Sequence, residues 1–108
     1  MDIFIKRDGT KIVPEFFIHI IGVVLKPYWL RKFQVIQEDY ERVCILVVPS
    51  IEKSEAQILI ETGRIELERM VKLVMGEKCK LEVQLVDAIP SLPSGKYRYT
   101  ISKVNRLG

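Results

Sequence analysis

The amino-acid sequence predicts a two-layer α+β domain with a central three-stranded sheet, two helices and a small N-terminal hairpin. Length is the first observation, since 108 residues suit one compact domain and are too few for two. Composition is the second, because 48% hydrophobic and 29% charged residues are typical of a globular chain with a core. The third is the predicted order of elements: hairpin, helix, strand, strand, helix, strand, loop and strand.

The hairpin is predicted at the start of the chain. Residues 3–6 and 11–13 are short β-prone runs, and Asp8-Gly9 lies between them. Glycine readily adopts the positive φ that a tight hairpin turn requires. The pair therefore indicates a turn that joins two short antiparallel strands.

The first helix is predicted from Pro14 to about Lys26. Proline suits the first turn of a helix because its missing N–H would have no partner there, and Pro27 ends the segment. Residues 16–25 are apolar except for His19 and Gly22. A helix this apolar must be covered on most sides.

The second helix has the clearest periodicity in the chain. Ser54 with Gln57 three residues later matches a capping box, which predicts the helix start. Apolar or small residues then recur at steps of three and four until Gly76. They are Ala56, Leu59, Gly63, Leu67, Met70, Val71 and Val74.

Four further segments have strand character. Residues 33–37 and 43–48 flank a polar turn, and the second is continuously apolar, as expected of a buried central strand. Residues 79–85 alternate between apolar and polar, which predicts a half-buried strand. The last segment, residues 97–102, alternates in the same way, with Tyr97, Tyr99 and Ile101 as its apolar side.

Charge and composition exclude several classes. The net charge is +3, and the 17 basic residues are interleaved with 14 acidic ones, which argues against a nucleic-acid interface. Tyr97 and Tyr99 are the one aromatic pair that an RNA-binding strand could use. The apolar stretch of residues 16–25 is too short to span a bilayer, so we expect no membrane partner.

The two cysteines, Cys44 and Cys79, both lie in apolar, strand-like runs. We expect them to be reduced core residues of a cytoplasmic protein, with a disulfide as the alternative. The chain holds one histidine and no Cys-x-x-Cys pair, a composition that argues against a structural zinc site, and we expect no metal in this chain.

Residues 87–98 are the segment whose side chains best suit a role in binding or catalysis. A proline-rich loop leads to Ser94-Gly95-Lys96, where glycine permits close approach of the backbone and lysine supplies a mobile positive charge for an anion. The simpler interpretation is a solvated lysine in a glycine turn. A phosphate-binding P-loop fits poorly, because Tyr97 stands where that motif requires serine or threonine.

The same segment resembles the last core motif of the adenylate-forming superfamily, in Pro90, Gly95 and Lys96, with Arg98 one residue earlier than usual. Residues 2–14 resemble the hinge motif that opens the C-terminal domain of these enzymes, with Asp2 at the hinge position and Gly9 in the following loop. Within the superfamily, the chain is most similar to phenylacetate-CoA ligase and its relatives found with capsular-polysaccharide genes. Residues 33–37, 86–90 and 94–99 carry that similarity.

The resemblance implies that residues 1–108 form the mobile C-terminal lid domain of an ATP-dependent, AMP-forming carboxylate–CoA ligase. Lys96 would then be the catalytic lysine of acyl-adenylate formation, Gly9 and Gly95 would approach the cofactors, and Asp2 would be the hinge. ATP, CoA and Mg²⁺ would be bound mainly by the large N-terminal domain, which this sequence lacks. The domain alone is therefore expected to be inactive.

The expected partners are that N-terminal domain and a carboxylic acid, for which an aryl acid is one candidate. The apolar helix of residues 16–25 should leave an exposed patch where the larger domain packs, and this patch could also support a dimer. The alternative to a ligase domain is a free-standing ferredoxin-like regulatory or interaction module, because such modules share the predicted order of elements.

Overall fold

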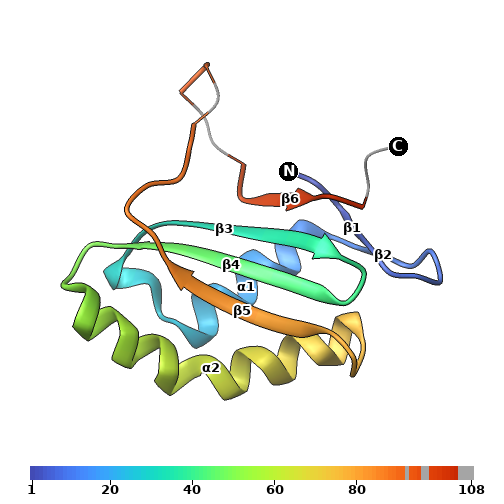
Figure 1. Ribbon diagram of the computed structural model, residues 1–108, viewed down its shortest axis with the longest axis horizontal. Helices are drawn as coiled ribbons and strands as arrows, with labels where there is room; N and C mark the ends of the chain where they lie inside the picture. Colours follow the sequence, from blue (N-terminus) through green and yellow to red (C-terminus); the bar gives the residue numbers. More distant parts are fainter. Residues whose placement is uncertain (92, 96–97, 105–108) are drawn as a thin grey trace.

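The computed structural model describes residues 1–91, 93–95 and 98–104. It is a two-layer α+β fold, with helices beneath a sheet and a hairpin at one end (Figure 1). The elements in chain order are β1 (Phe4–Ile5), β2 (Lys11–Ile12), α1 (Pro14–Val24), the 3₁₀ helix η1 (Pro27–Trp29), β3 (Leu30–Asp39), β4 (Arg42–Pro49), α2 (Lys53–Met75), β5 (Lys80–Leu85) and β6 (Thr100–Ser102).

The main sheet contains four strands in the described part of the chain, in the order β5-β4-β3-β6, so the expected three-stranded sheet is wrong. β3 and β4 form an antiparallel pair, whereas β5 is parallel to β4 and β6 is parallel to β3. The additional strand is the three-residue β6. It lies within the predicted strand segment of residues 97–102, and its place in the main sheet depends on the free edge that β3 offers.

The faces of β6 are also opposite to the expected ones. Thr100 and Ser102 are buried, whereas Ile101 is only half-buried and Tyr99 lies outside the strand and is exposed. The polar residues can face inward because Asp2 and Gln37 supply hydrogen-bond partners for them. Local alternation cannot reveal such partners, since they come from the other end of the chain and from β3.

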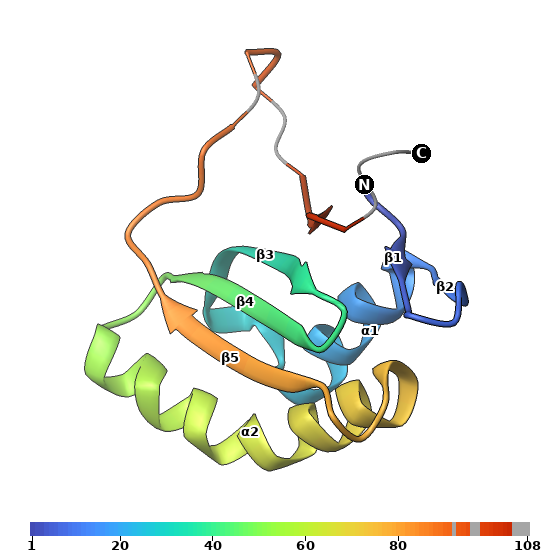
Figure 2. The ribbon, with the colours of Figure 1, turned by 45° about the vertical axis from the view of Figure 1, so that its right-hand side comes forward.

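Helices α1 and α2 both pack on one face of the sheet, and the loop after β5 rises on the other side (Figure 2). The core between the layers includes Phe17 and Ile20 from α1, Val35 and Ile45 from the sheet, and Leu67 from α2. Gly63 allows α1 close to α2, because a Cβ atom there would lie 3.1 Å from Val24 Cγ1 and 3.2 Å from Leu25 Cδ2.

The helix boundaries differ slightly from the predicted ones. α1 ends at Val24, and Lys26 takes a left-handed conformation with φ of +50° before Pro27. α2 begins at Lys53, so Ser54 lies inside the helix, and Glu52 at the cap makes no side-chain capping bond. The predicted capping box is therefore wrong, whereas the end of α2 next to Gly76 is confirmed.

α1 is covered on one side only. Phe17 and Ile20 are buried, whereas Val23 is 55% exposed and His19 is also exposed.

None of the helices in the described ranges is long and apolar enough to cross a membrane. Within these ranges, no group of histidine, cysteine and acidic side chains is arranged to hold a metal ion.

Cys44 and Cys79 are buried free thiols, as predicted. Burial raises the pKa of each to about 11, with nearby Glu82 adding to the effect on Cys44 and Asp39 to that on Cys79. Both thiols therefore stay protonated and unreactive at neutral pH.

Candidate functional site

The predicted hairpin turn is confirmed at Gly9. The Lys6 N–H donates to Thr10 O, and the Gly9 N–H donates to Lys6 O, both at 2.9 Å. Gly9 has a φ of +89°, a conformation that favours glycine. No atom lies within 4 Å of the place where a Cβ would stand, so the space beside Gly9 is open. Hydrogen bonds from the side chain and the N–H of Thr10 lower the pKa of the Asp8 carboxyl.

The hairpin is joined to the main sheet by its own side chains. Arg7 forms an ion pair with Glu41 at 3.0 Å, and its guanidinium lies 5.0 Å from the centre of the Tyr40 ring. Both partners belong to the turn between β3 and β4. The contacts are exposed and each is individually weak, but together they orient the hairpin relative to the sheet.

Asp2, the predicted hinge residue, is bonded to β6 through its N–H, its main-chain oxygen and its carboxylate. Its N–H donates to Thr100 O at 3.2 Å, and its main-chain oxygen accepts the Thr100 hydroxyl at 2.8 Å. Its carboxylate accepts the Ser102 N–H at 2.9 Å and lies 3.9 Å from the Arg98 guanidinium. The start of the chain is thus tied to the strand that follows the predicted catalytic loop.

Gln37 links the hairpin to β6 from inside the fold. The side chain is fully buried, and its amide N–H donates to Ile5 O at 2.7 Å. Its amide oxygen accepts the Ile5 N–H at 3.2 Å and the Ser102 hydroxyl at 2.6 Å. The Gln37 amide therefore acts on β1 as the peptide group of a neighbouring strand would.

The first residues of the loop after β5 are held to the domain by two contacts. Val86 N–H donates to Val47 O at 2.9 Å, and Asp87 pairs with Lys53 at 2.6 Å. Ile89, at the start of this loop, is buried. Beyond it, Pro90, Ser91 and residues 93–95 are exposed.

Gly95 is exposed and has a φ of +87°, a conformation that favours glycine directly before the predicted catalytic lysine. Lys96 itself lies outside the described residues, as does Tyr97. The next described residue is Arg98, whose carbonyl oxygen accepts the Gln34 amide at 2.9 Å. The ring of Tyr99 then lies 5.3 Å from that of Phe33.

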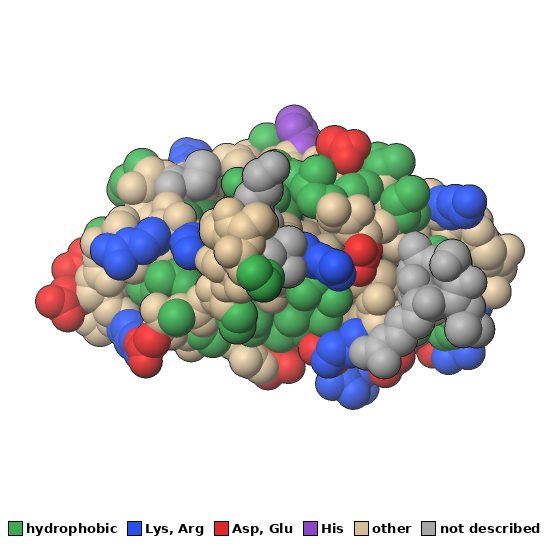
Figure 3. Space-filling model, turned by 90° about the horizontal axis from the view of Figure 1, so that it is seen from above, with side chains coloured by type: hydrophobic (Ala, Val, Ile, Leu, Met, Phe, Trp, Pro, Cys, Tyr) green, Lys and Arg blue, Asp and Glu red, His purple; other side chains and the backbone are tan. Residues whose placement is uncertain are grey.

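The structure brings Asp2 together with β6 but keeps Gly9 and Gly95 apart. The loop tip projects from the face opposite the helices, while the hairpin turn lies at one end of the sheet (Figures 1 and 2). Hydrophobic side chains gather on this open face, partly beneath the loop (Figure 3). Strand alternation places Ile36, Leu46 and Val48 there, since Val35 and Val47 face the core.

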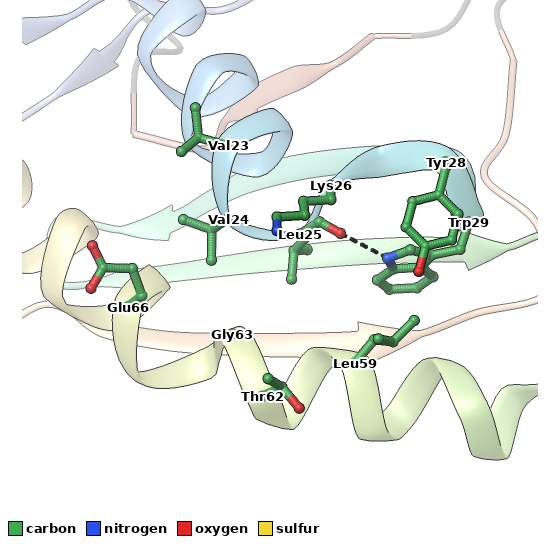
Figure 4. A pocket seen from close by; sticks show the side chains of 10 residues that line it. All are labelled: Val23, Val24, Leu25, Lys26, Tyr28, Trp29, Leu59, Thr62, Gly63 and Glu66. Carbon is green, nitrogen blue, oxygen red and sulfur yellow. Dashed lines mark hydrogen bonds between the residues drawn. The ribbon is translucent and has the colours of Figure 1, made fainter.

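A separate groove of about 490 Å³ lies between the end of α1 and the middle of α2 (Figure 4). Trp29 is buried beside it and donates its indole N–H to Leu25 O at 2.7 Å. Tyr28, by contrast, is 80% exposed at the rim. Trp29 therefore packs as a core residue, and the groove shares no residue with the two loops described above.

Sequence analysis missed the roles of Gln34 and Gln37. Both stand in the strand-forming run Phe33-Gln34-Val35-Ile36-Gln37, and both are buried. Two glutamines inside a strand of this kind are a signal in themselves, because a buried amide requires hydrogen-bond partners.

The fold and these contacts define a small α+β domain that presents a glycine hairpin and a long glycine-containing loop from a shared hydrogen-bonded base. The chain belongs to the CapK C-terminal domain family, whose model matches residues 4–103. This match confirms the family resemblance drawn from the motifs at the two ends of the sequence. No curated protein matched the chain in the corresponding comparison.

Several solved structures are similar, and two of them are described here. One is a crystal structure of an open conformation of 2-hydroxyisobutyryl-CoA ligase in complex with 2-HIB-AMP and CoA; it is 24% identical, with a TM-score of 0.53. The similarity covers 93% of this chain but only 21% of the ligase, and at this identity it shows a shared fold. The other is a domain of phenylacetate-coenzyme A ligase from Bacteroides vulgatus ATCC 8482, with 19% identity, 94% coverage of both chains and a TM-score of 0.49.

Proposed function

We propose that this chain is the mobile C-terminal domain of an ATP-dependent, AMP-forming carboxylate–CoA ligase. The observation that carries the proposal is the exposed loop that contains Gly95, directly before Lys96. This loop leads into β6, the strand that is bonded to Asp2. Family membership supports it, and so does the fold shared with one part of 2-hydroxyisobutyryl-CoA ligase.

In the first half-reaction, a carboxylate oxygen attacks the α-phosphorus of ATP, and the bond to pyrophosphate breaks. Lys96 serves as a positive charge beside the carboxylate and the oxygens around the reacting phosphate. A positioned cation stabilises charge that develops in the transition state, most strongly once water is excluded. Lysine suits this task because its charge is compact and its stem is long and flexible.

In the second half-reaction, the thiol of CoA attacks the acyl carbon and displaces AMP. The domain rotates between the two halves, and the hairpin turn then lines the path of the CoA arm. Gly9 supports this role because the space next to its Cα is open. The bonds of Asp2 to Thr100 and Ser102 make Asp2 and β6 move together unless those bonds break.

ATP, CoA and Mg²⁺ are bound mainly by the larger N-terminal domain, which is the principal partner of this one. The exposed Val13 and Val23 at the two ends of α1 support a contact with that domain, and the same residues offer a surface for a dimer. We propose a carboxylic acid, with an aryl acid as one candidate, as the substrate. We further propose a cytoplasmic enzyme without a nucleic-acid or membrane partner, whose C-terminal domain is inactive alone.

The alternative, a ferredoxin-like regulatory module, is not favoured. Its order of elements requires a strand before α1 in the main sheet, and here β1 and β2 form a separate two-stranded sheet. Such a module would also have no use for a lysine next to Gly95.

The decisive experiment uses the complete ligase that contains this domain. Lys96→Ala should slow pyrophosphate exchange by about 10²- to 10³-fold, the usual effect of losing one preorganised electrostatic contact. Release of AMP from preformed acyl-adenylate by CoA should change much less. Lys78→Ala, at an exposed lysine before β5, is the matched control. Unchanged pyrophosphate exchange in Lys96→Ala would contradict the proposal.

A further inference from the structure

Gln34 is a buried polar residue on the face of the sheet away from the helices. Its neighbours Phe33 and Val35 pack toward the core, so the alternation of the strand turns Gln34 to the opposite side. Only 6% of Gln34 is exposed, and its amide N–H donates to the carbonyl oxygen of Arg98 at 2.9 Å. Arg98 is the second residue after Lys96.

Arg98 and its neighbour are held at several points. Beside the Gln34 bond, the guanidinium of Arg98 lies 3.9 Å from the Asp2 carboxylate, and Val35 N–H donates to Tyr99 O at 2.8 Å. On the other side of Lys96, Gly95 is exposed and has a φ open mainly to glycine. Among the described residues that follow Gly95, Arg98 is the first with such contacts.

We propose that Gln34 is a positioning residue for Lys96; the proposal rests on the proposed function of that lysine. Gln34 holds the main chain at Arg98, two residues after Lys96 in the sequence, and its proposed role is to position the lysine through that contact. A catalytic group displaced by about 1 Å can lose about 10²-fold in rate, so one anchoring bond of the loop matters. Being buried, the amide is not readily replaced by water at the Arg98 carbonyl.

The first test is Gln34→Met in the complete ligase, since methionine keeps the length of the side chain and removes the donor. We expect kcat of pyrophosphate exchange to fall by about tenfold, with KM for ATP and for the acid within about twofold, because positioning acts on the transition state. AMP release from preformed acyl-adenylate by CoA should not change. Gln84→Met is the control, because Gln84 is exposed and its amide bonds only to Glu82 among the described contacts.

The second test is the same substitution in the Lys96→Ala background. A positioning residue acts only through the lysine, so Gln34→Met should cause no further loss there. An equal loss in both backgrounds would assign Gln34 a purely structural role and overturn the proposal. An unaffected Gln34→Met enzyme beside a slow Lys96→Ala enzyme would overturn it too, but would leave the proposed function intact. If thermal melting shows that Gln34→Met is partly unfolded, Gln34→Asn, whose amide is one methylene too short, replaces it.

Discussion

Asp2 and Ser102 stand 100 positions apart, yet the Ser102 N–H donates to the Asp2 carboxylate at 2.9 Å. The contact joins the segment before β1 to β6, the last strand of the described residues. Asp2 is thus bonded directly to β6, and β6 follows the loop that carries Lys96. In the lid domain proposed above, this contact would link the proposed hinge residue to the strand that follows the loop of Lys96.

Asp2→Ala should destabilise the domain by about 1–3 kcal/mol, because the Ser102 N–H loses its acceptor in a part-buried position. Asp2→Asn should cost less, since its amide oxygen can still accept that bond. Urea denaturation of the isolated domain measures both values. Asp8→Ala is the control, because the Asp8 carboxylate accepts an exposed turn N–H. Equal stabilities for Asp2→Ala and Asp8→Ala would contradict the proposed structural role of Asp2.

Gln37→Leu should destabilise the domain by about 3 kcal/mol, because the N–H and C=O of Ile5 and the hydroxyl of Ser102 lose a buried partner. Gln84→Leu, at an exposed position of β5, should stay within about 0.5 kcal/mol of the parent. Denaturation midpoints of the two variants are compared directly. A Gln37→Leu domain as stable as Gln84→Leu would show that this bonding network contributes little.

Gly9→Val in the complete ligase should obstruct the CoA-dependent half-reaction and spare pyrophosphate exchange, because the added side chain occupies the open space beside the turn. Gly76→Val provides a matched control for backbone strain, since Gly76 also has a positive φ, +113°, and an open surrounding. The two half-reactions are measured separately. If Gly76→Val slows CoA-dependent AMP release as much as Gly9→Val, backbone strain alone explains the effect.

The two helical glycines should respond in opposite directions. Gly22→Ala should stabilise the domain by about 0.5–1 kcal/mol, because its Cβ meets open space and alanine favours the helix. Gly63→Val should destabilise it by about 1–3 kcal/mol, because its side chain would press on Val24 and Leu25. Thermal melting distinguishes them, and a stabilised Gly63→Val variant would contradict the observed contact between α1 and α2.

Cys44 and Cys79 should react slowly with a thiol-specific disulfide reagent in the native state at pH 8. With each pKa raised to about 11, only about one thiol in a thousand is ionised at that pH. Because the folded state favours the neutral thiol, this contribution to stability is present below the ordinary pKa of 9.0 and is lost as pH rises through about 11. Denatured protein is the control, and rapid labelling of the native form would contradict the burial of both thiols.

The turn conformations in the candidate site could be predicted because their signals are local. The turn at Gly9 follows from the conformational freedom of glycine, and Gly95 has the positive φ that suits the end of the Lys96 loop. The roles of Gln34 and Gln37 could not be assigned in the same way. A glutamine in a strand-forming run shows that a partner is needed, but the partners here lie 32, 64 and 65 positions away.

By itself, the sequence determined the α+β class, the long helix α2, the buried strand β4 and the glycine turn, because each depends on contacts or preferences between residues close in the chain. Only the tertiary structure decided that β6 would lie parallel to β3 as a fourth strand, with Thr100 and Ser102 turned inward. The sequence of a three-residue strand hardly favours one sheet edge or one inward-facing side over another. Its place and its faces are set by the free edge of β3 and by hydrogen bonds to Asp2 and Gln37, and a shift of one residue in register would exchange its two faces.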